Sequence, residues 1–290
     1  MTSETDGHAA GGARYDPDYV RAYYDAFGAR EWERFERTPA NRVNLHLHLW
    51  HLRRHIRAGQ HVLDVGAGPG RFTIELARLG ARVTVGDLSP VQLELNRQKV
   101  QEAGAEGSVV ARALLDVTDL GALPSESFDA TVCYGGALSY VFDRADRAVG
   151  ELLRVTRPGG LVLLSVMSLL GTCRRFLADC LATARQHGPE TVRELLATGD
   201  QIGALAGGHT CHLYRWAELE ALLRRHPCEV VDVAAANFLA IGGNEALLPP
   251  VLEDAALWEA YLAWEVECCR QPGAVDGGTH IIAVVRRTRG

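Results

Sequence analysis

The residues best suited to chemistry begin with a glycine-rich segment, Asp64-Val65-Gly66-Ala67-Gly68-Pro69-Gly70, which follows a short apolar stretch and precedes a helical pattern. Glycines allow the backbone to turn sharply and a ligand to approach it closely. A dinucleotide fingerprint would place its third glycine at position 71, but this residue is an arginine. A pyrophosphate would also gain nothing from the carboxylate of Asp64. The segment therefore indicates a ligand that carries positive charge rather than phosphate.

S-adenosylmethionine has a sulfonium, an ammonium and no phosphate, so the carboxylate of Asp64 suits it. Its other groups match the ends of three further expected strands. Asp87 lies 23 residues after Asp64, where its carboxylate can accept hydrogen bonds from both ribose hydroxyls. Asp116 can accept from the adenine amino group, and Val117 can offer its backbone N–H. Tyr134-Gly135-Gly136 has a small backbone that can lie under the methionine part.

Alternating strands and helices are expected to position these segments. Strands are predicted at 61–65, 82–86, 109–115, 129–134 and 161–166, and helices at 71–79, from residue 89, and at 143–156. Ser89-Pro90-x-Gln92 is a capping box that begins the second helix, and Arg157-Pro158-Gly159-Gly160 stops the third. Such alternation predicts a mostly parallel sheet with helices on both faces. The carboxyl ends of its strands face one crevice, so the candidate segments should converge there.

The remaining chain is expected to add a cover. Residues 1–14 are small and polar and should be disordered, whereas residues 15–57 should form helices separated by Pro39. Residues 168–212 read as a helical insertion at the upper edge of the sheet. The alternation resumes with a helix at 216–225, a strand at 229–234, a helix near 254–269 and a strand at 279–285. We expect one domain over 15–290, with 15–57 and 168–212 covering the site.

These segments resemble the class I S-adenosylmethionine-dependent methyltransferases. The resemblance is carried by VLDVGAGPG at 62–70, VGDLS at 85–89, LLDVTDL at 114–120, FDATVCYGG at 128–136 and RVTRPGGLVLLSV at 154–166. It implies an α/β fold, a Rossmann-like doubly wound sheet of seven strands with the last antiparallel, plus a helical cap. The candidate cofactor contacts are Asp64, Gly66, Ala67, Gly68, Gly70, Asp87, Leu88, Gln92, Asp116, Val117, Tyr134 and Gly135. The outer helices resemble those of actinobacterial small-molecule tailoring enzymes.

The resemblance implies in-line methyl transfer to oxygen, nitrogen or carbon of a small-molecule acceptor, in secondary metabolism. The leaving thioether is neutral and needs no acid, so the protein must chiefly align the acceptor and exclude water. A base is required only where the acceptor's proton leaves early. His209, His212 and Tyr140 are the candidate bases, and Tyr24, Ser139 and Tyr140 are the candidate acceptor contacts.

A metal site is not expected. His48, His51 and His55 recur at helical spacing, with His46 nearby, and histidine is a common metal ligand. No acid accompanies this set in the sequence, so a partly solvated helix face is the expectation. The seven cysteines form no Cys-x-x-Cys pair, and Cys211 with its flanking histidines fits no standard zinc spacing.

Charge and hydropathy limit the classes of partner that this protein is expected to have. The net charge of −6 and the lack of a basic tail argue against a nucleic-acid acceptor. The longest apolar run, residues 161–170, is too short to span a bilayer, and no signal-peptide pattern is seen, so a cytoplasmic protein is expected. A homo-oligomer stays open.

Three other interpretations stay open on the sequence alone. A nicotinamide oxidoreductase is disfavoured by Arg71 and Asp64. A noncatalytic or regulatory S-adenosylmethionine-binding protein could share the fold, because fold does not fix function. A nucleic-acid or protein methyltransferase is disfavoured by the acidic balance.

Overall fold

A seven-stranded sheet forms the centre of the computed structural model, which describes residues 13–202 and 209–289. The strand order is β3-β2-β1-β4-β5-β9-β8. The strands are β1 His61–Val65, β2 Arg82–Asp87, β3 Val109–Leu114, β4 Phe128–Cys133, β5 Thr156–Met167, β8 Cys228–Ala235 and β9 His280–Arg287. Strands β1 to β5 pair in parallel, and β9 runs antiparallel between β5 and β8. The predicted α/β Rossmann-like sheet with its antiparallel last strand is therefore confirmed.

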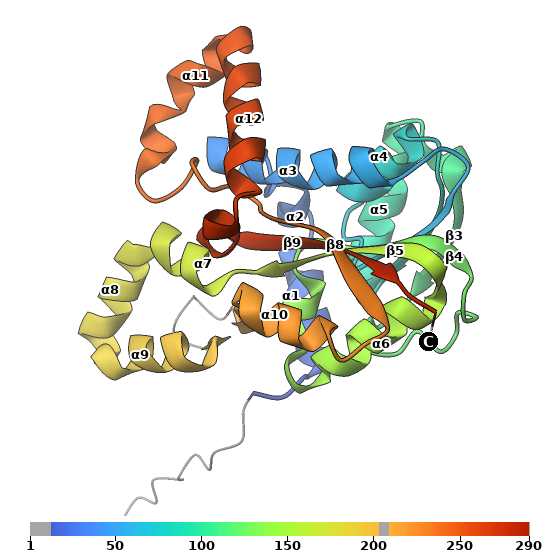
Figure 1. The fold of residues 1–290 in the computed structure, drawn as a ribbon, viewed down its shortest axis with the longest axis horizontal. Helices are drawn as coiled ribbons and strands as arrows, with labels where there is room; N and C mark the ends of the chain where they lie inside the picture. The colour runs from blue at the N-terminus through green and yellow to red at the C-terminus, as the bar shows by residue number, and fades with distance from the viewer. Residues whose placement is uncertain (1–12, 203–208, 290) are drawn as a thin grey trace, which may run out of the picture.

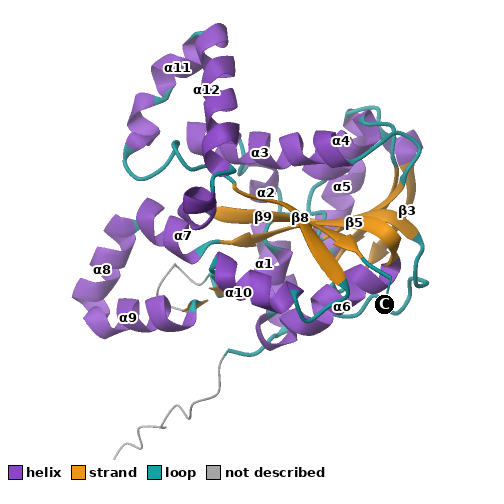
Figure 2. Ribbon diagram, in the orientation of Figure 1, coloured by secondary structure: helices purple, strands orange, loops and turns teal. Residues whose placement is uncertain are grey.

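Helices cover both faces of this sheet (Figures 1 and 2). The helices α3 Pro39–His55, α4 Arg71–Arg78 and α5 Pro90–Glu102 lie along one face, and α6 Ala145–Val155 and α10 Trp216–Leu223 along the other. Side chains alternate between the faces along each strand. Val62 of β1 thus packs in the core beneath α3 and α4, while Leu63 and Val65 pack in the core beneath α6 and α10.

The N-terminal segment folds as α1 Pro17–Phe27, α2 Arg30–Glu33 and then α3. Asp16 and Thr38 act as N-caps, and a proline occupies the first turn of α1 and of α3, where its missing N–H costs nothing. The expected solvated histidine face on α3 is wrong. His48 and His51 are 1% and 0% exposed, because this helix lies between the sheet and α12 Ala255–Cys269.

The segment after β5, of which the structure describes residues 168–202 and 209–212, contains α7 Leu169–Arg175, α8 Leu177–His187 and α9 Pro189–Thr198. It also contains a small antiparallel pair that was not predicted, β6 Asp200–Gln201 and β7 Cys211–His212. A further unpredicted helix, α11 Pro249–Glu253, precedes α12, and the two project away from the sheet (Figure 1). Within the described ranges, no helix is both long and apolar enough to cross a membrane.

Residues 157–160, which were predicted to end a helix, instead lie within strand β5. Strand β5 begins at Thr156, which pairs with Phe128, and Leu161 pairs with the second residue after Phe128, so residues 157–160 form an irregularity. The glycines permit it: Gly159 has φ of +80°, and a Cβ on Gly160 would come within 2.7 Å of the Asp129 carbonyl oxygen.

Candidate active site

The turn between β1 and α4 is shaped by glycines in the left-handed region. Gly66 has φ of +67°, and a Cβ there would lie 2.8 Å from the Cβ of Ala137. Gly70 has φ of +96° and begins α4. Neither position would accept a larger residue without strain, so the turn stays free of side chains and open to a ligand.

Asp87 ends β2 beside this turn and is held by backbone donors. The Gly68 N–H donates to Oδ2 at 2.8 Å, and the Ser89 N–H donates to Oδ1 at 2.8 Å. Burial raises the pKa of Asp87 to about 6. Each carboxylate oxygen keeps a further lone pair, so Asp87 can still accept hydrogen bonds from hydroxyl groups of a ligand.

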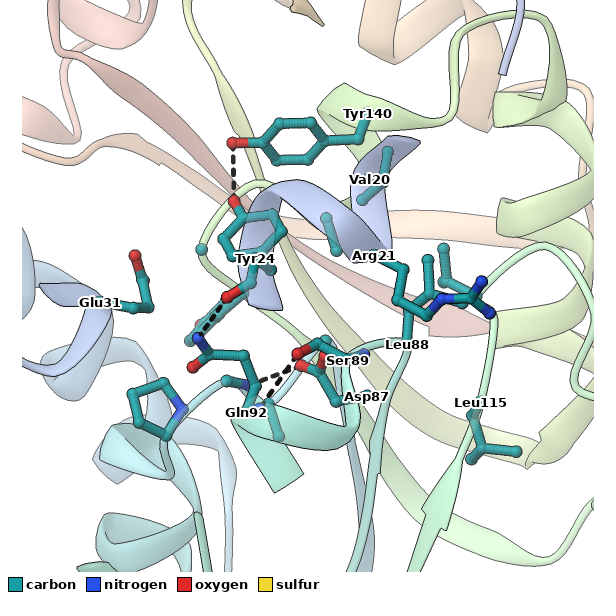
Figure 3. A pocket seen from close by; sticks show the side chains of 18 of the residues that line it. Val20, Arg21, Tyr24, Glu31, Asp87, Leu88, Ser89, Gln92, Leu115 and Tyr140 are labelled. Atoms are coloured by element: carbon teal, nitrogen blue, oxygen red, sulfur yellow. Dashed lines mark hydrogen bonds between the residues drawn. The ribbon is translucent and has the colours of Figure 1, made fainter. Parts of the chain in front are cut away.

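A cavity of about 860 Å³, including its part open to solvent, lies over the turn and the ends of β2 and β4 (Figure 3). We call it the inner cavity. Most of the predicted cofactor residues line it, together with two predicted acceptor contacts: Gly66, Ala67, Gly68, Asp87, Leu88, Gln92, Val117, Tyr134 and Gly135, with Tyr24 and Tyr140. The predicted convergence of the strand ends is thus seen in the structure.

Three predicted cofactor residues, Asp64, Gly70 and Asp116, do not line the inner cavity. Side chains alternate along β1, and Asp64 points beneath α4, where its Oδ2 accepts a hydrogen bond from the Thr73 hydroxyl at 2.6 Å. Burial raises the pKa of Asp64 to about 7. The Asp64 carboxylate therefore faces α4 and not the inner cavity, and its expected contact with a ligand cation stays a prediction.

Asp116 is covered by the N-terminal segment. Its Oδ1 accepts from the Thr118 N–H at 2.7 Å, and its Oδ2 accepts from the Tyr15 hydroxyl at 3.0 Å. Tyr15 itself lines the inner cavity. A ligand amino group that donates to Asp116 Oδ2 from the inner cavity would share this oxygen with the Tyr15 hydroxyl.

Helix α1 lies across the inner cavity and is tied to α5. The predicted capping box is half present: the Ser89 hydroxyl accepts from the Gln92 N–H at 3.0 Å. The Gln92 side chain does not return to Ser89. Its Nε2 donates to the carbonyl oxygens of Tyr24 and Gly28 at 3.0 and 3.1 Å, and so fastens the end of α1.

A chain of hydrogen bonds leads away from α1, and Figure 3 shows its first bond, between Tyr24 and Tyr140. The Tyr24 hydroxyl donates to the Tyr140 hydroxyl at 2.7 Å, and this hydroxyl lies 2.6 Å from Nε2 of His209. Burial raises the pKa of both tyrosines well above the usual range, so they stay protonated. Burial, and to a smaller extent the charge of Arg34, lowers the pKa of His209, so its ring is neutral near pH 7 and Nε2 can accept a hydrogen bond from the Tyr140 hydroxyl.

The other two candidates lie elsewhere. His212 contacts Asp200 through Nδ1 at 2.6 Å and Glu218 through Nε2 at 2.7 Å. Burial lowers the pKa of His212, but these two carboxylates outweigh it and raise the pKa to about 9. The structure thus places a charged histidine outside the inner cavity, unsuited to act as a base. Ser139 is fully buried and accepts from the Met167 N–H at 2.9 Å.

A second cavity adjoins the first, since Arg34 and Phe35 line both. This outer cavity, about 1980 Å³ with its open part, lies between α3, α7, α8 and the ends of β5 and β9. His209 lines it, so the Tyr140–His209 hydrogen bond joins the walls of the two cavities. At its floor, Asn44 Nδ2 donates to Thr279 at 3.1 Å, and the buried Asn44 Oδ1 has no partner.

Sequence analysis missed three charged residues of the inner cavity, Arg21, Glu31 and Arg34, of which Glu31 and Arg34 form an ion pair at 2.7 Å. They precede the first strand, and no spacing rule connects them with the glycine turn. Arg71, which the sequence used only to exclude a dinucleotide, lies over the Trp32 ring at 3.7 Å and so fixes α2 beside the turn.

This chain is similar in sequence to known methyltransferases. Residues 63–164 match the family described as "Methyltransferase domain". A ubiquinone biosynthesis O-methyltransferase of Xanthomonas axonopodis pv. citri is 35% identical over 179 residues, which cover 61% of this chain but only 66% of that protein. A malonyl-[acyl-carrier protein] O-methyltransferase of Erwinia billingiae is 32% identical over 197 residues, 59% of this chain and 72% of that protein.

Solved structures share the whole fold at low identity. The [4+2]-cyclase SpnF superposes with a TM-score of 0.61 at 19% identity and covers 97% of this chain and 98% of its own. The 1,6-didemethyltoxoflavin-N1-methyltransferase of Burkholderia thailandensis, solved with S-adenosylhomocysteine, has a TM-score of 0.57 at 18% identity, covering 99% of both chains. The chain belongs to the class I S-adenosylmethionine-dependent methyltransferases, and S-adenosylmethionine is its cofactor.

Proposed function

We propose that this protein transfers the methyl group of S-adenosylmethionine to an oxygen atom of a small-molecule acceptor. The observation that carries the proposal is the pair of adjoining cavities, which share Arg34 and Phe35. In this proposal the inner cavity takes the cofactor and the outer cavity takes the body of the acceptor, whose hydroxyl would reach through the junction to Tyr24 and Tyr140. The methyl group would then lie at their junction, where the acceptor can reach it in line and water is excluded.

In the inner cavity, Asp87 would accept hydrogen bonds from the ribose hydroxyls, because its oxygens keep free lone pairs. The carboxylate that suits the positive charge of the cofactor is Glu31 rather than Asp64, since Glu31 lines the cavity and Asp64 does not. The guanidinium of Arg34 would pair with the methionine carboxylate at the junction. Val117 and Tyr134 would contact the adenine and methionine parts.

The acceptor's proton would leave through Tyr140 and His209. The acceptor hydroxyl would donate to the Tyr140 oxygen in place of Tyr24, while Tyr140 passes its own proton to Nε2 of neutral His209. When bound, S-adenosylmethionine would supply an electrophilic methyl carbon to the freed acceptor oxygen, with the neutral thioether of S-adenosylhomocysteine as the leaving group. Tyr24 would contact the acceptor, and Ser139 would position Met167 beneath it through the backbone.

Oxygen is proposed as the acceptor atom because both relatives named above are O-methyltransferases. A role in secondary metabolism, of the actinobacterial tailoring type, belongs to the same proposal and rests on the resemblance of the outer helices. Residues 15–57 and the helices α7 to α9 are proposed to be the cap over the two cavities, since both segments line them.

A protein that binds S-adenosylmethionine without transferring its methyl group is the second candidate. The fold does not decide between the two, because a protein described as a [4+2]-cyclase shares it over nearly the whole chain.

Titration calorimetry tests the cofactor assignment. S-adenosylmethionine and S-adenosylhomocysteine should both bind, and NAD and ATP should bind far more weakly, because no phosphate-binding glycine is present at position 71. Tight NAD binding would refute the assignment.

A further inference from the structure

Two histidines of α3 and one aspartate of β8 meet on the sheet face that α3 covers. His51 and His55 lie one helical turn apart, with parallel rings whose centroids are 6.2 Å apart. The Asp232 Oδ2 atom lies 3.6 Å from His51 Nδ1 and 3.5 Å from His55 Nε2. One ligand-type atom from each of the three residues lies within 4.8 Å of the others. Asp232 of β8 is thus the acidic partner of these histidines, which could not be found from the sequence around α3.

The hydrogen bonding of this cluster is incomplete. His51 is fully buried, and neither of its ring nitrogens has a hydrogen-bond partner. Buried polar groups without partners are rare, because each costs about 1–3 kcal/mol of desolvation. A neutral imidazole nitrogen that has no hydrogen-bond partner can offer its lone pair to a metal ion.

The spacing fits a metal ion. A tetrahedral zinc ion with bonds of about 2.0–2.2 Å holds its ligand atoms about 3.3–3.6 Å apart. The two distances from Asp232 Oδ2, 3.5 and 3.6 Å, fall in that range. The ligand nitrogens of the two histidines lie within 4.8 Å of each other, so the imidazole rings would turn toward the ion to close the site. Two imidazole nitrogens and one carboxylate oxygen are a ligand set that zinc and related ions accept. We propose that His51, His55 and Asp232 bind a divalent transition-metal ion of the zinc class, which fastens α3 to β8.

Two arginines compete for the same carboxylate. Arg54 and Arg270 lie 3.9 and 3.7 Å from Asp232, farther than a hydrogen bond, and their side chains are 54% and 40% exposed. Each also lies over the Trp50 ring, at 5.3 and 5.2 Å. They can therefore swing into solvent, but their charge weakens the attraction of a cation. The rival explanation is an ion-pair cluster in which the arginines alone balance Asp232.

Zinc titration of the full-length protein by calorimetry at pH 7.5 separates the two explanations. The wild type should bind one Zn²⁺ at this cluster and unfold at a higher temperature with it. His55→Ala and Asp232→Asn should each weaken this binding at least about tenfold. His46→Ala, on the same helix but outside the cluster, is the matched control and should bind like the wild type. Circular dichroism checks that each variant is folded.

Two further measurements sharpen the test. Arg270→Ala should tighten Zn²⁺ binding, since it removes a competing cation, whereas an ion-pair cluster gains no metal affinity from this change. Co²⁺ bound at the cluster should show d–d absorption without a thiolate charge-transfer band, which excludes binding by the free cysteines. Zn²⁺ affinity that is unchanged in folded His55→Ala and Asp232→Asn, or absent in the wild type, would overturn the proposal.

Discussion

The hydroxyl of Tyr140 lies 2.6 Å from Nε2 of His209, although 69 positions separate the two residues in the chain. Tyr140 lines the inner cavity and His209 the outer one, so this hydrogen bond crosses the wall between the proposed cofactor and acceptor sites. A neutral histidine at this point can accept a proton that a tyrosine relays.

The first prediction concerns the pH dependence of methyl transfer. Burial lowers the pKa of His209 below its usual 6.5, so the ring becomes a competent base as pH rises through that lowered value. The rate should therefore rise with pH below about 6.5 and level off at neutral pH. His209→Ala should lower kcat by about 10²- to 10⁴-fold and remove this acidic limb. Tyr140→Phe should also lose it, because the relay hydroxyl is gone. An unchanged profile in both variants would show that the proton leaves by another route.

The second prediction concerns the ribose contact. Asp87→Ala should lose about 1.5–3 kcal/mol of S-adenosylhomocysteine affinity, the usual range for hydrogen bonds to a charged group. The measurement is titration calorimetry, with the exposed Glu94→Ala on α5 as the control. Equal affinity of a folded Asp87→Ala variant and the wild type would place the ribose elsewhere.

The third prediction concerns Asp64, which the structure buries against Thr73. Its folded pKa of about 7 lies above its usual 3.8, so the folded state holds a proton there that the unfolded state releases. This residue therefore favours folding at low pH, and its contribution is lost as pH rises from about 4 through 7. Asp64→Asn should remove that loss, seen as a smaller difference in the free energy of unfolding between pH 5 and pH 8.

Cofactor affinity gives a second readout for the same substitution. Asp64→Asn should bind S-adenosylhomocysteine nearly as the wild type does, whereas Glu31→Gln should bind it more weakly. Weaker binding by Asp64→Asn and unchanged binding by Glu31→Gln would show that Asp64 contacts the positive charge of the ligand, as the sequence alone suggested.

The fourth prediction concerns the cap. Hydrogen exchange should slow in α1 and in the helices α7 to α9, as well as in the 64–70 turn, when S-adenosylhomocysteine binds. Deletion of residues 1–30 should abolish turnover, because Tyr24 and the Gln92 contacts to α1 are then lost. If protection rises in the turn alone and the shortened protein still turns over, α1 is no part of the cap.

The sheet could be read from the sequence because its signals are local. Apolar strands, a capping serine at Ser89 and glycines at the first turn each act within a few residues, and the structure follows them closely. Even the convergence of Asp87 and Tyr134 follows from parallel strands ending at one edge. The orientation of Asp64 toward Thr73 could not be read in this way, because a strand alternates its faces and which face meets the ligand depends on the turn.

Contacts between distant segments could not be read in this way. Asp232 reaches His55 across 177 positions, and no periodicity within α3 announces an acid from the sheet. Glu31 and Arg34 reach the inner cavity because α2 and the residue after it pack near the turn, where Arg71 lies over the Trp32 ring. Such pairs depend on how separate elements pack, which a single sequence does not show.

The most direct test of the central claim is a transfer assay with methyl-labelled S-adenosylmethionine and a panel of phenolic and carboxylic acceptors, read by mass spectrometry. The proposed function predicts a labelled O-methyl product and S-adenosylhomocysteine in equal amounts with at least one acceptor, and a large loss of both in His209→Ala. Tight binding of S-adenosylmethionine with no label transferred to any acceptor would contradict methyl transfer and favour a binding role on the same fold.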